Sequence, residues 1–196
     1  MYMNSSHQVE EAQEGSDQAG HPILVMNDHL TNMTFSSVVP QKGVHAYSVV
    51  RVSNDISLLG HTELVLKSDN EASINALKDA VKAEASQKIQ LSWRAGVRAA
   101  RIVPEESAAY DSQSNGRVEG AIRHVQGKVR TLKDALESRY NKEIAQGHAS
   151  LPWLIRHASW LKNRFVVGSD GKRHTKDGKE ESSRRTWLSL ASASCS

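Results

Sequence analysis

A carboxylate at the start of a long amphipathic helix is the first candidate for chemistry in this sequence. Apolar residues recur at steps of four and three, which places them on one helical face: Val118, Ile122, Val125, Val129, Leu132 and Leu136. Glu119 lies one residue round from that face, and lysines and arginines cover much of the remaining surface. Such a carboxylate can bind a metal ion while the cations bind phosphate, although a surface helix with a favourable acid near its N-terminus explains the same pattern.

A second acid follows a short apolar run. Residues 64–66 are Leu-Val-Leu, and this continuous apolarity indicates a strand that is buried on both faces. Asp69 then lies at the C-terminal end of the strand, where open α/β sheets place their functional sites. The spacing of 50 residues between Asp69 and Glu119 (119 − 69) leaves room for the elements that would bring the two acids together.

In this order, the two motifs resemble the catalytic core of retroviral-type integrases and related transposases, and most closely the integrase core of retroelement polyproteins. The segment LKSDNE at 66–71 is similar to the second Asp motif of that family, and SNGRVEGAIRHVQGKVRTL at 114–132 to its Glu motif. The segment PWLIRHASWLKNRF at 152–165 fits the helix that follows. The resemblance covers roughly residues 23–171 and implies a ribonuclease H-like fold, a mixed α/β sheet of about five strands flanked by helices.

The resemblance implies DNA integration, in which a polynucleotidyl transferase joins element ends to target DNA with Mg²⁺ (or Mn²⁺) bound by carboxylates. Asp69 and Glu119 are the expected catalytic and metal-binding residues. Residues expected to contact DNA are Asn115, Arg123, Gln126, Lys128 and Arg130, although a solvated helix face explains Arg123 and Gln126 almost as well. The expected partners are element ends and target DNA, with a possible homo-oligomer, and the resemblance points to the nucleus.

The family uses three acids, and the first belongs in the middle of the first strand. This chain has no acid there, so either the strand is cut, with residues 1–3 as its tail, or Asn4 takes the place of the acid. We favour the cut strand and therefore expect impaired catalysis that an upstream Asp would restore. The alternatives are a non-catalytic DNA-binding or assembly module from a decayed element, and a ribonuclease H-like nuclease that only hydrolyses.

Bulk properties agree with a nucleic-acid-binding domain without requiring it. The chain has 196 residues, a length typical of one domain, and 38% hydrophobic residues allow a real core. A net charge of +3 and a pI near 9.0 permit nucleic-acid binding. The mean hydropathy of −0.52 argues against a membrane protein. The single cysteine, Cys195, excludes an internal disulfide and a cysteine-based zinc site.

The expected elements follow from apolar periodicity and turn residues. Strands are expected at 22–26, 33–39, 63–68 and 97–104, and helices at 44–59, 72–85, from Val118 onward, and at 153–165. Asp28 is interpreted as a turn residue, residues 105–114 as a loop, and Leu154, Leu161 and Phe165 as core residues of the last helix. Residues 1–20 are expected to hold a partial first strand and an acidic loop, residues 21–171 the integrase-like core, and residues 172–196 a disordered charged tail.

Overall fold

The computed structural model describes residues 21–61, 63–68, 71–95, 101–106, 112–145, 147–167 and 186–193. The elements in chain order are β1 (Ile23–Asp28), β2 (Thr34–Val38), α2 (Ala46–Leu59), β3 (Glu63–Ser68), α3 (Ala72–Ala95), β4 (Arg101–Glu106), α4 (Ser112–Tyr140), α5 (Leu151–Phe165) and β5 (Thr186–Ala193). The expected first strand near residues 1–3, the acidic loop to residue 20, and Asp69 itself lie outside the described residues.

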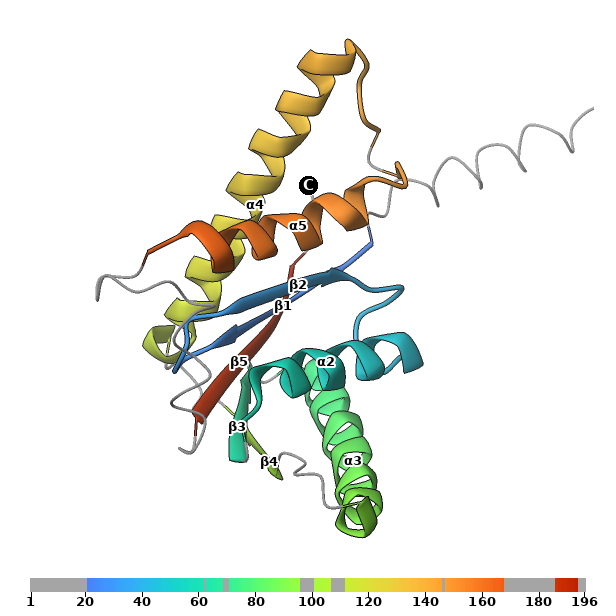
Figure 1. The fold of residues 1–196 in the computed structure, drawn as a ribbon, viewed down its shortest axis with the longest axis vertical. Coiled ribbons are helices and arrows are strands. Elements are labelled where there is room, and N and C mark those ends of the chain that lie inside the picture. The colour runs from blue at the N-terminus through green and yellow to red at the C-terminus, as the bar shows by residue number, and fades with distance from the viewer. Residues whose placement is uncertain are drawn as a thin grey trace, which may run out of the picture.

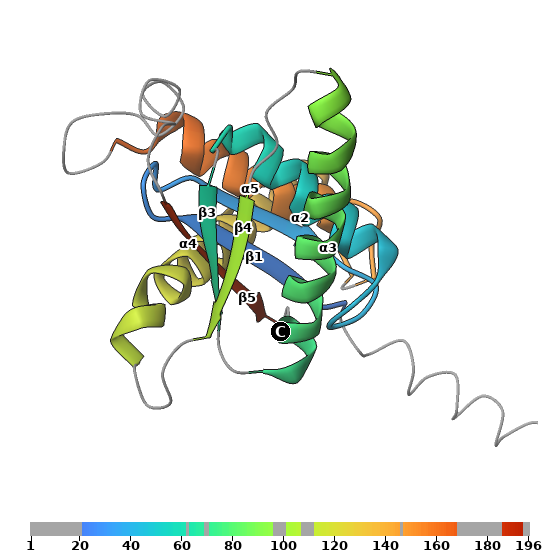
Figure 2. The ribbon, with the colours of Figure 1, turned by 90° about the horizontal axis from the view of Figure 1, so that it is seen from below.

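The five strands form one mixed sheet in the order β2-β1-β5-β3-β4. Antiparallel pairing joins β1 to β2 and to β5, whereas β3 is parallel to both β5 and β4. The hairpin expected from the sequence is confirmed, with Ile23 opposite Val38 and Asn27 opposite Thr34. Figures 1 and 2 show the helices on both faces of this sheet, so the predicted class, an α/β protein with a mixed five-stranded sheet flanked by helices, is confirmed.

Two cores lie on opposite faces of the sheet, because successive side chains of a strand point to opposite sides. Leu24 and Met26 of β1 pack with residues of α2 and α3, including Val52 and Leu77. Ile23 and Val25 face the other way, into a cluster with residues of α4 and α5: Ala121, Val125, Val129, Ile155 and Ala158. All six residues of β1 are buried, as expected for a strand covered on both faces.

The last strand corrects the sequence-based prediction most clearly. Residues 172–196 were expected to form a disordered tail, but 186–193 form β5, which lies between β1 and β3. Leu188 and Leu190 alternate with Ser189 and enter the core beside Leu24 and Leu66. The prediction is therefore wrong for 186–193, because pairing on both edges and burial of two leucines outweigh the polar composition of the segment before them.

Other predictions fail, wholly or in part, at the level of single elements. Asp28 is the last residue of β1 and is fully buried, but its carboxylate has the predicted turn role, because it accepts hydrogen bonds from the amides of Leu30 and Thr31. Phe165 lies 59% exposed at the end of α5, where its ring meets Trp160 edge-on instead of the core. Helix α4 already begins at Ser112, inside the expected loop, because helical hydrogen bonds extend one residue at a time from its packed body. Helix α3 continues ten residues beyond Ala85, to Ala95.

Candidate active site and nucleic-acid interface

The position of Glu119 on α4 follows from the phase of the helix. Val118 is buried, and Ala121 and Val125 pack α4 against the sheet and α5. Glu119, one residue after Val118, is exposed. The structure therefore places Glu119 on the exposed surface of α4, one residue from its buried face.

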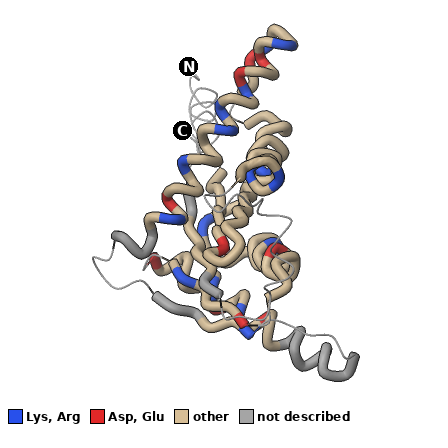
Figure 3. The backbone as a smooth tube through the Cα atoms, turned by 60° about the vertical axis from the view of Figure 1, so that its left-hand side comes forward, with Lys and Arg blue, Asp and Glu red and all other residues tan. Residues whose placement is uncertain are grey.

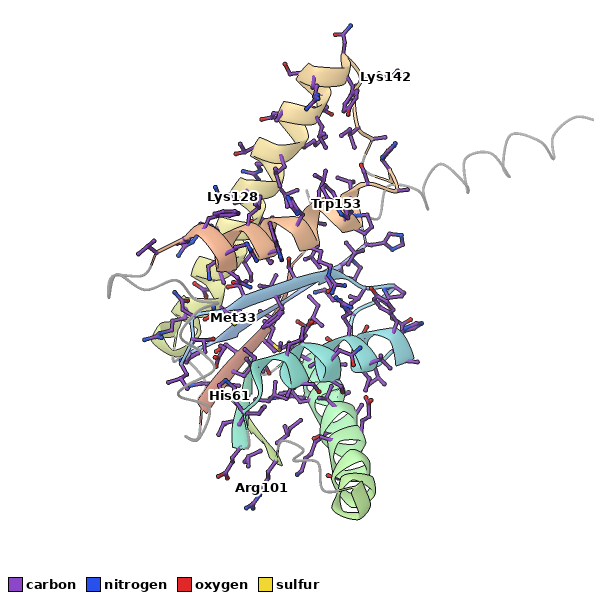
Figure 4. The ribbon with its side chains drawn as sticks, in the orientation of Figure 1. Met33, His61, Arg101, Lys128, Lys142 and Trp153 are labelled. Atoms are coloured by element: carbon purple, nitrogen blue, oxygen red, sulfur yellow. The ribbon has the colours of Figure 1, made fainter. Side chains whose placement is uncertain are left out.

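The predicted DNA-contacting residues are spread along the same helix. Arg123, Lys128 and Arg130 are exposed, and Gln126 is half-buried. Asn115 falls within the first turns of α4, and its side chain lies outside the described ones. Figure 3 shows Lys and Arg recurring along α4, and Figure 4 labels Lys128 close to the point where α4 passes α5. At about 100° per residue, Arg123 and Arg130 lie on the same side of α4 as Glu119, whereas Lys128 lies on the opposite side.

A chain of polar contacts ties the start of α4 to the middle of the sheet. Arg117 donates a hydrogen bond from Nη1 to the backbone oxygen of His29 at 3.3 Å. The His29 ring in turn bonds to the hydroxyl of Ser189 through Nε2 at 2.8 Å. Ser189 lies opposite Lys67 in the ladder between β5 and β3, one residue before β3 ends at Ser68. The first turns of α4 therefore meet the sheet close to the C-terminal end of β3.

The pKa of His29 reflects its position where the start of α4 meets the sheet. Burial lowers the pKa of His29, and the charges of Arg117 and then Lys67 lower it further, while Asp28 acts in the opposite direction. The charges of Lys67 of β3 and Arg117 of α4 therefore act on the same imidazole. A neutral His29 is the form that these two cations favour.

Asp69, the other predicted catalytic acid, directly follows β3 but lies outside the described residues. Its expected approach to Glu119 therefore stays a prediction. Within the described residues, no group of three or more His, Cys, Asp or Glu side chains is arranged to hold a metal ion. The exposed carboxylate of Glu119 offers the hard oxygen ligands that Mg²⁺ prefers, so this part of the donor set fits the expected ion.

A buried hydrogen bond between two ionisable side chains at the end of β1 was missed by the sequence analysis. Asp28 accepts a hydrogen bond from Nε2 of His61 at 3.1 Å, and both side chains are inaccessible to solvent. Burial acts to raise the pKa of Asp28, but hydrogen bonds from His61 and from the hydroxyl and amide of Thr31 outweigh it, so the pKa is lowered. This pair fixes the end of β1, next to His29. No sequence pattern announces it, because His61 and Asp28 belong to different elements.

Two polar residues of α5 bind the turn that connects β1 to β2. Lys162 donates from Nζ to the Asn32 oxygen at 2.8 Å and to the Thr34 hydroxyl at 2.6 Å. The amide of Asn163 binds both the N–H of Thr34, at 2.9 Å, and its C=O, at 2.8 Å, much as a neighbouring strand would. Burial lowers the pKa of Lys162 to about 8. Lys162 lies three residues after the buried Ser159, on the inward stripe of α5, and that spacing is the signal that could have revealed it.

A third buried charge lines a groove of about 260 Å³ between α2, the edge strand β2 and α5. Asp55 is 6% exposed, and its carboxylate lies 4.0 Å from Arg51. Burial raises the pKa of Asp55 to about 6, against a smaller lowering by Arg51. Ionised Asp55 therefore destabilises the folded state.

Replacing Asp55 with Asn should stabilise the protein at neutral pH. The folded carboxyl binds its proton more tightly than the unfolded one, so the stability of the native protein falls as pH rises from about 4 to about 6. A shift from 3.8 to about 6 corresponds to roughly 3 kcal/mol above that window. Urea unfolding of Asp55→Asn should show a gain approaching this value at pH 7 and almost none at pH 4.

Asp79→Asn is the matched control, because Asp79 is exposed on α3. It should change stability by less than about 0.5 kcal/mol at either pH. An Asp55→Asn protein that is less stable than the parent at pH 7 would show that the contact with Arg51 outweighs the burial of the charge.

With this geometry in view, the sequence was compared with known proteins. It matches no family model and no curated protein. The described residues contain no helix that is both long enough and apolar enough to cross a lipid bilayer. The functional assignment therefore rests on the sequence motifs and on the arrangement of α4, β3 and β5.

Proposed function

We propose that the chain is an integrase-like domain of a retroelement that binds DNA and carries out metal-dependent DNA strand transfer with impaired efficiency. The proposal is supported by the two sequence motifs in their order and by an α/β sheet with helices on both faces. Within this proposal, the fold is of the ribonuclease H-like type.

One observation carries the proposal furthest. Glu119 is exposed two residues after Arg117, and Arg117 is bonded to the His29 backbone beside Ser189 and Lys67. The helix that carries one predicted acid is therefore fastened near the end of the strand that leads to the other. This is the arrangement that a site shared by Asp69 and Glu119 requires.

The proposed reaction is an in-line attack of a hydroxyl on a DNA phosphodiester. Arg123, Lys128 and Arg130 would hold the phosphate backbone along α4, which positions the reacting group. Asp69 and Glu119 would be the ligands of Mg²⁺ or Mn²⁺. Negative charge develops on the attacking and leaving oxygens, and a bound divalent ion stabilises it.

A second candidate, a non-catalytic DNA-binding or assembly module, is favoured by the centre of β5. Ser189 is fully buried there, between Asn27 of β1 and Lys67 of β3. An acidic residue at this position of β5 would bring a carboxylate close to the end of β3. The residue there is a serine, which supplies a hydroxyl instead. DNA binding without reaction is the result that this second candidate predicts, and hydrolysis without joining is the result that a ribonuclease H-like nuclease predicts.

DNA binding should depend strongly on salt and on the cations of α4. Each Lys or Arg contact to a phosphate releases counterions, so Arg123→Ala with Lys128→Ala should weaken binding to duplex DNA at every salt concentration. The slope of log affinity against log salt should become shallower by about 1.8, or 0.9 for each lost contact. Both effects can be measured by fluorescence anisotropy of a labelled duplex at salt concentrations between about 50 and 200 mM.

Lys42→Ala with Lys82→Ala is the control, since it removes the same charge from exposed positions outside α4. It should leave the slope nearly unchanged. If the control lowers affinity and slope as much as the α4 pair does, binding follows net charge alone, and α4 is not the interface.

The homo-oligomer and the nuclear location also remain proposals. Sedimentation velocity across a tenfold range of concentration, with and without duplex DNA, tests self-association directly. A single monomer boundary under all of these conditions would remove the oligomer from the proposal.

A further inference from the structure

A cavity of about 380 Å³ lies between the second half of α4, the start of α5 and the hairpin of β1 and β2. Its floor consists of core side chains: Ile23, Val38, Val125, Val129 and Ile155. Helices α4 and α5 diverge toward the loop that joins them, as Figure 1 shows. The cavity lies on the outer side of their shared core, in the size range of small-molecule sites, which is about 300–1,000 Å³.

Two cations lie on the rim of this cavity. Arg130 and Lys133 line it from α4, beside the polar side chains of His148 from the loop before α5 and His21 from the segment before β1. Asp134 is the one acid among its lining residues. Lys133 also contacts Glu137 at 3.6 Å, whereas Arg130 forms no ion pair with a carboxylate among the described residues. An apolar floor with a positive rim favours a ligand with an apolar body and an anionic end.

We infer that this cavity binds a small organic carboxylate, with its apolar body against Val125, Val129 and Ile155 and its carboxylate at Arg130 and Lys133. The inference does not depend on the proposed function, because Glu119, Arg123 and Lys128 do not line the cavity. Gln126 and Arg130 belong to both surfaces, so a bound carboxylate and DNA would compete for the Arg130 cation.

The contributions of the apolar body and of the carboxylate to the binding affinity can be measured separately with two probes of nearly equal size. 1-Naphthylacetate carries the carboxylate, and 2-(1-naphthyl)ethanol replaces it with a neutral hydroxyl. Isothermal titration calorimetry on the full chain should give the acid a Kd on the order of 10⁻⁴–10⁻³ M, as expected for a ligand of this size. The alcohol should bind about fivefold more weakly, since a partly exposed ion pair contributes up to about that factor.

Two sets of variants assign the contacts. Arg130→Gln with Lys133→Gln should weaken binding of the acid about fivefold and leave the alcohol unchanged. The control pair, Arg123→Gln with Lys128→Gln, removes the same charge from the same helix outside the cavity and should leave both probes unchanged. Ala149→Trp covers the mouth from an exposed turn position, so it should abolish binding of both probes without altering the thermal unfolding midpoint.

Each other outcome overturns the inference. Equal affinities for acid and alcohol would show that the rim does not select an anion. Absence of binding by both probes, or binding that survives Ala149→Trp, would show that the cavity is not the site. A sedimentation coefficient that falls in Ala149→Trp, with no effect on probe binding, would instead make a second copy of the chain the occupant.

Discussion

Replacing Leu188 and Leu190 of β5 together with Ala is expected to unfold the protein. These leucines are 0% and 1% exposed, and they sit in the core between β1 and β3. Each Leu→Ala change at a fully buried site costs about 2–5 kcal/mol, and the typical stability of a domain is only about 5–15 kcal/mol. Far-UV circular dichroism and urea unfolding should therefore show loss of the cooperative transition, or a midpoint close to zero denaturant.

Two control substitutions test whether the loss of stability results from the central position of β5 in the sheet. Leu58→Ala removes the same atoms at a position that is 69% exposed and should cost less than about 0.5 kcal/mol. Leu188→Met keeps the volume and should cost less than about 1.5 kcal/mol. A double variant that loses less than about 2 kcal/mol would mean that the sheet persists without β5 and that 172–196 is the dispensable tail that composition predicts.

The unmodified chain is expected to give almost no strand transfer with Mg²⁺ or Mn²⁺. Two acids, Asp69 and Glu119, can hold one ion, whereas a pair of ions requires a further carboxylate to bridge them. The loss of one strong electrostatic stabiliser typically lowers a rate by about 10²–10³, and the loss of an ion should cost at least that much. A gel assay with a labelled donor end and a target duplex measures joining, and it separates joining from simple hydrolysis.

Ser189→Asp is the change most directly suited to restoring activity, because Ser189 lies mid-strand beside Lys67 near the end of β3. In the unmodified chain, Nε2 of His29 is hydrogen-bonded to the Ser189 hydroxyl, and an aspartate at this position can accept the same hydrogen bond. We expect joining to rise by about 10²–10³, to depend on Mn²⁺ or Mg²⁺, and to disappear when Glu119→Gln is added.

Ser189→Asn is the control, since it matches the shape of Asp without its charge and should stay inactive. Robust Glu119-dependent joining by the unmodified chain would contradict the prediction, because the third ligand would then lie elsewhere. DNA binding without reaction in all variants would favour the non-catalytic module, and hydrolysis alone would favour the nuclease.

The sequence predicted those elements whose apolar residues recur with the period of a helix or a strand. The hairpin of β1 and β2, the strand β3 and the inward face of α4 all follow from runs of apolar residues, and the burial of Val118, Val125 and Val129 confirms the assigned phase. The exposure of Glu119 follows from the same phase. Such features need only neighbours in the sequence, so they can be predicted without knowledge of the fold.

Features that depend on distant partners were not predictable in this way. The strand β5 follows a charged segment, and only its pairing with β1 and β3 makes it central. The burial of Asp28 beside His61 and the burial of Lys162 against Thr34 of β2 both depend on residues that are distant in the sequence. The alternation of Leu188 and Leu190 around Ser189 was the available signal for β5.

The central place of β5 has a consequence for the time course of folding. Its pairing of Ala193 with Ile23 closes a separation of 170 residues (193 − 23), so this ladder belongs to the slow, non-local class of contacts. Until it forms, β1 and β3 each present an open, strongly apolar edge that can pair with the same edge of another chain. Refolding yield should therefore fall steeply as protein concentration rises, and the aggregates should be rich in intermolecular strands built from these two edges.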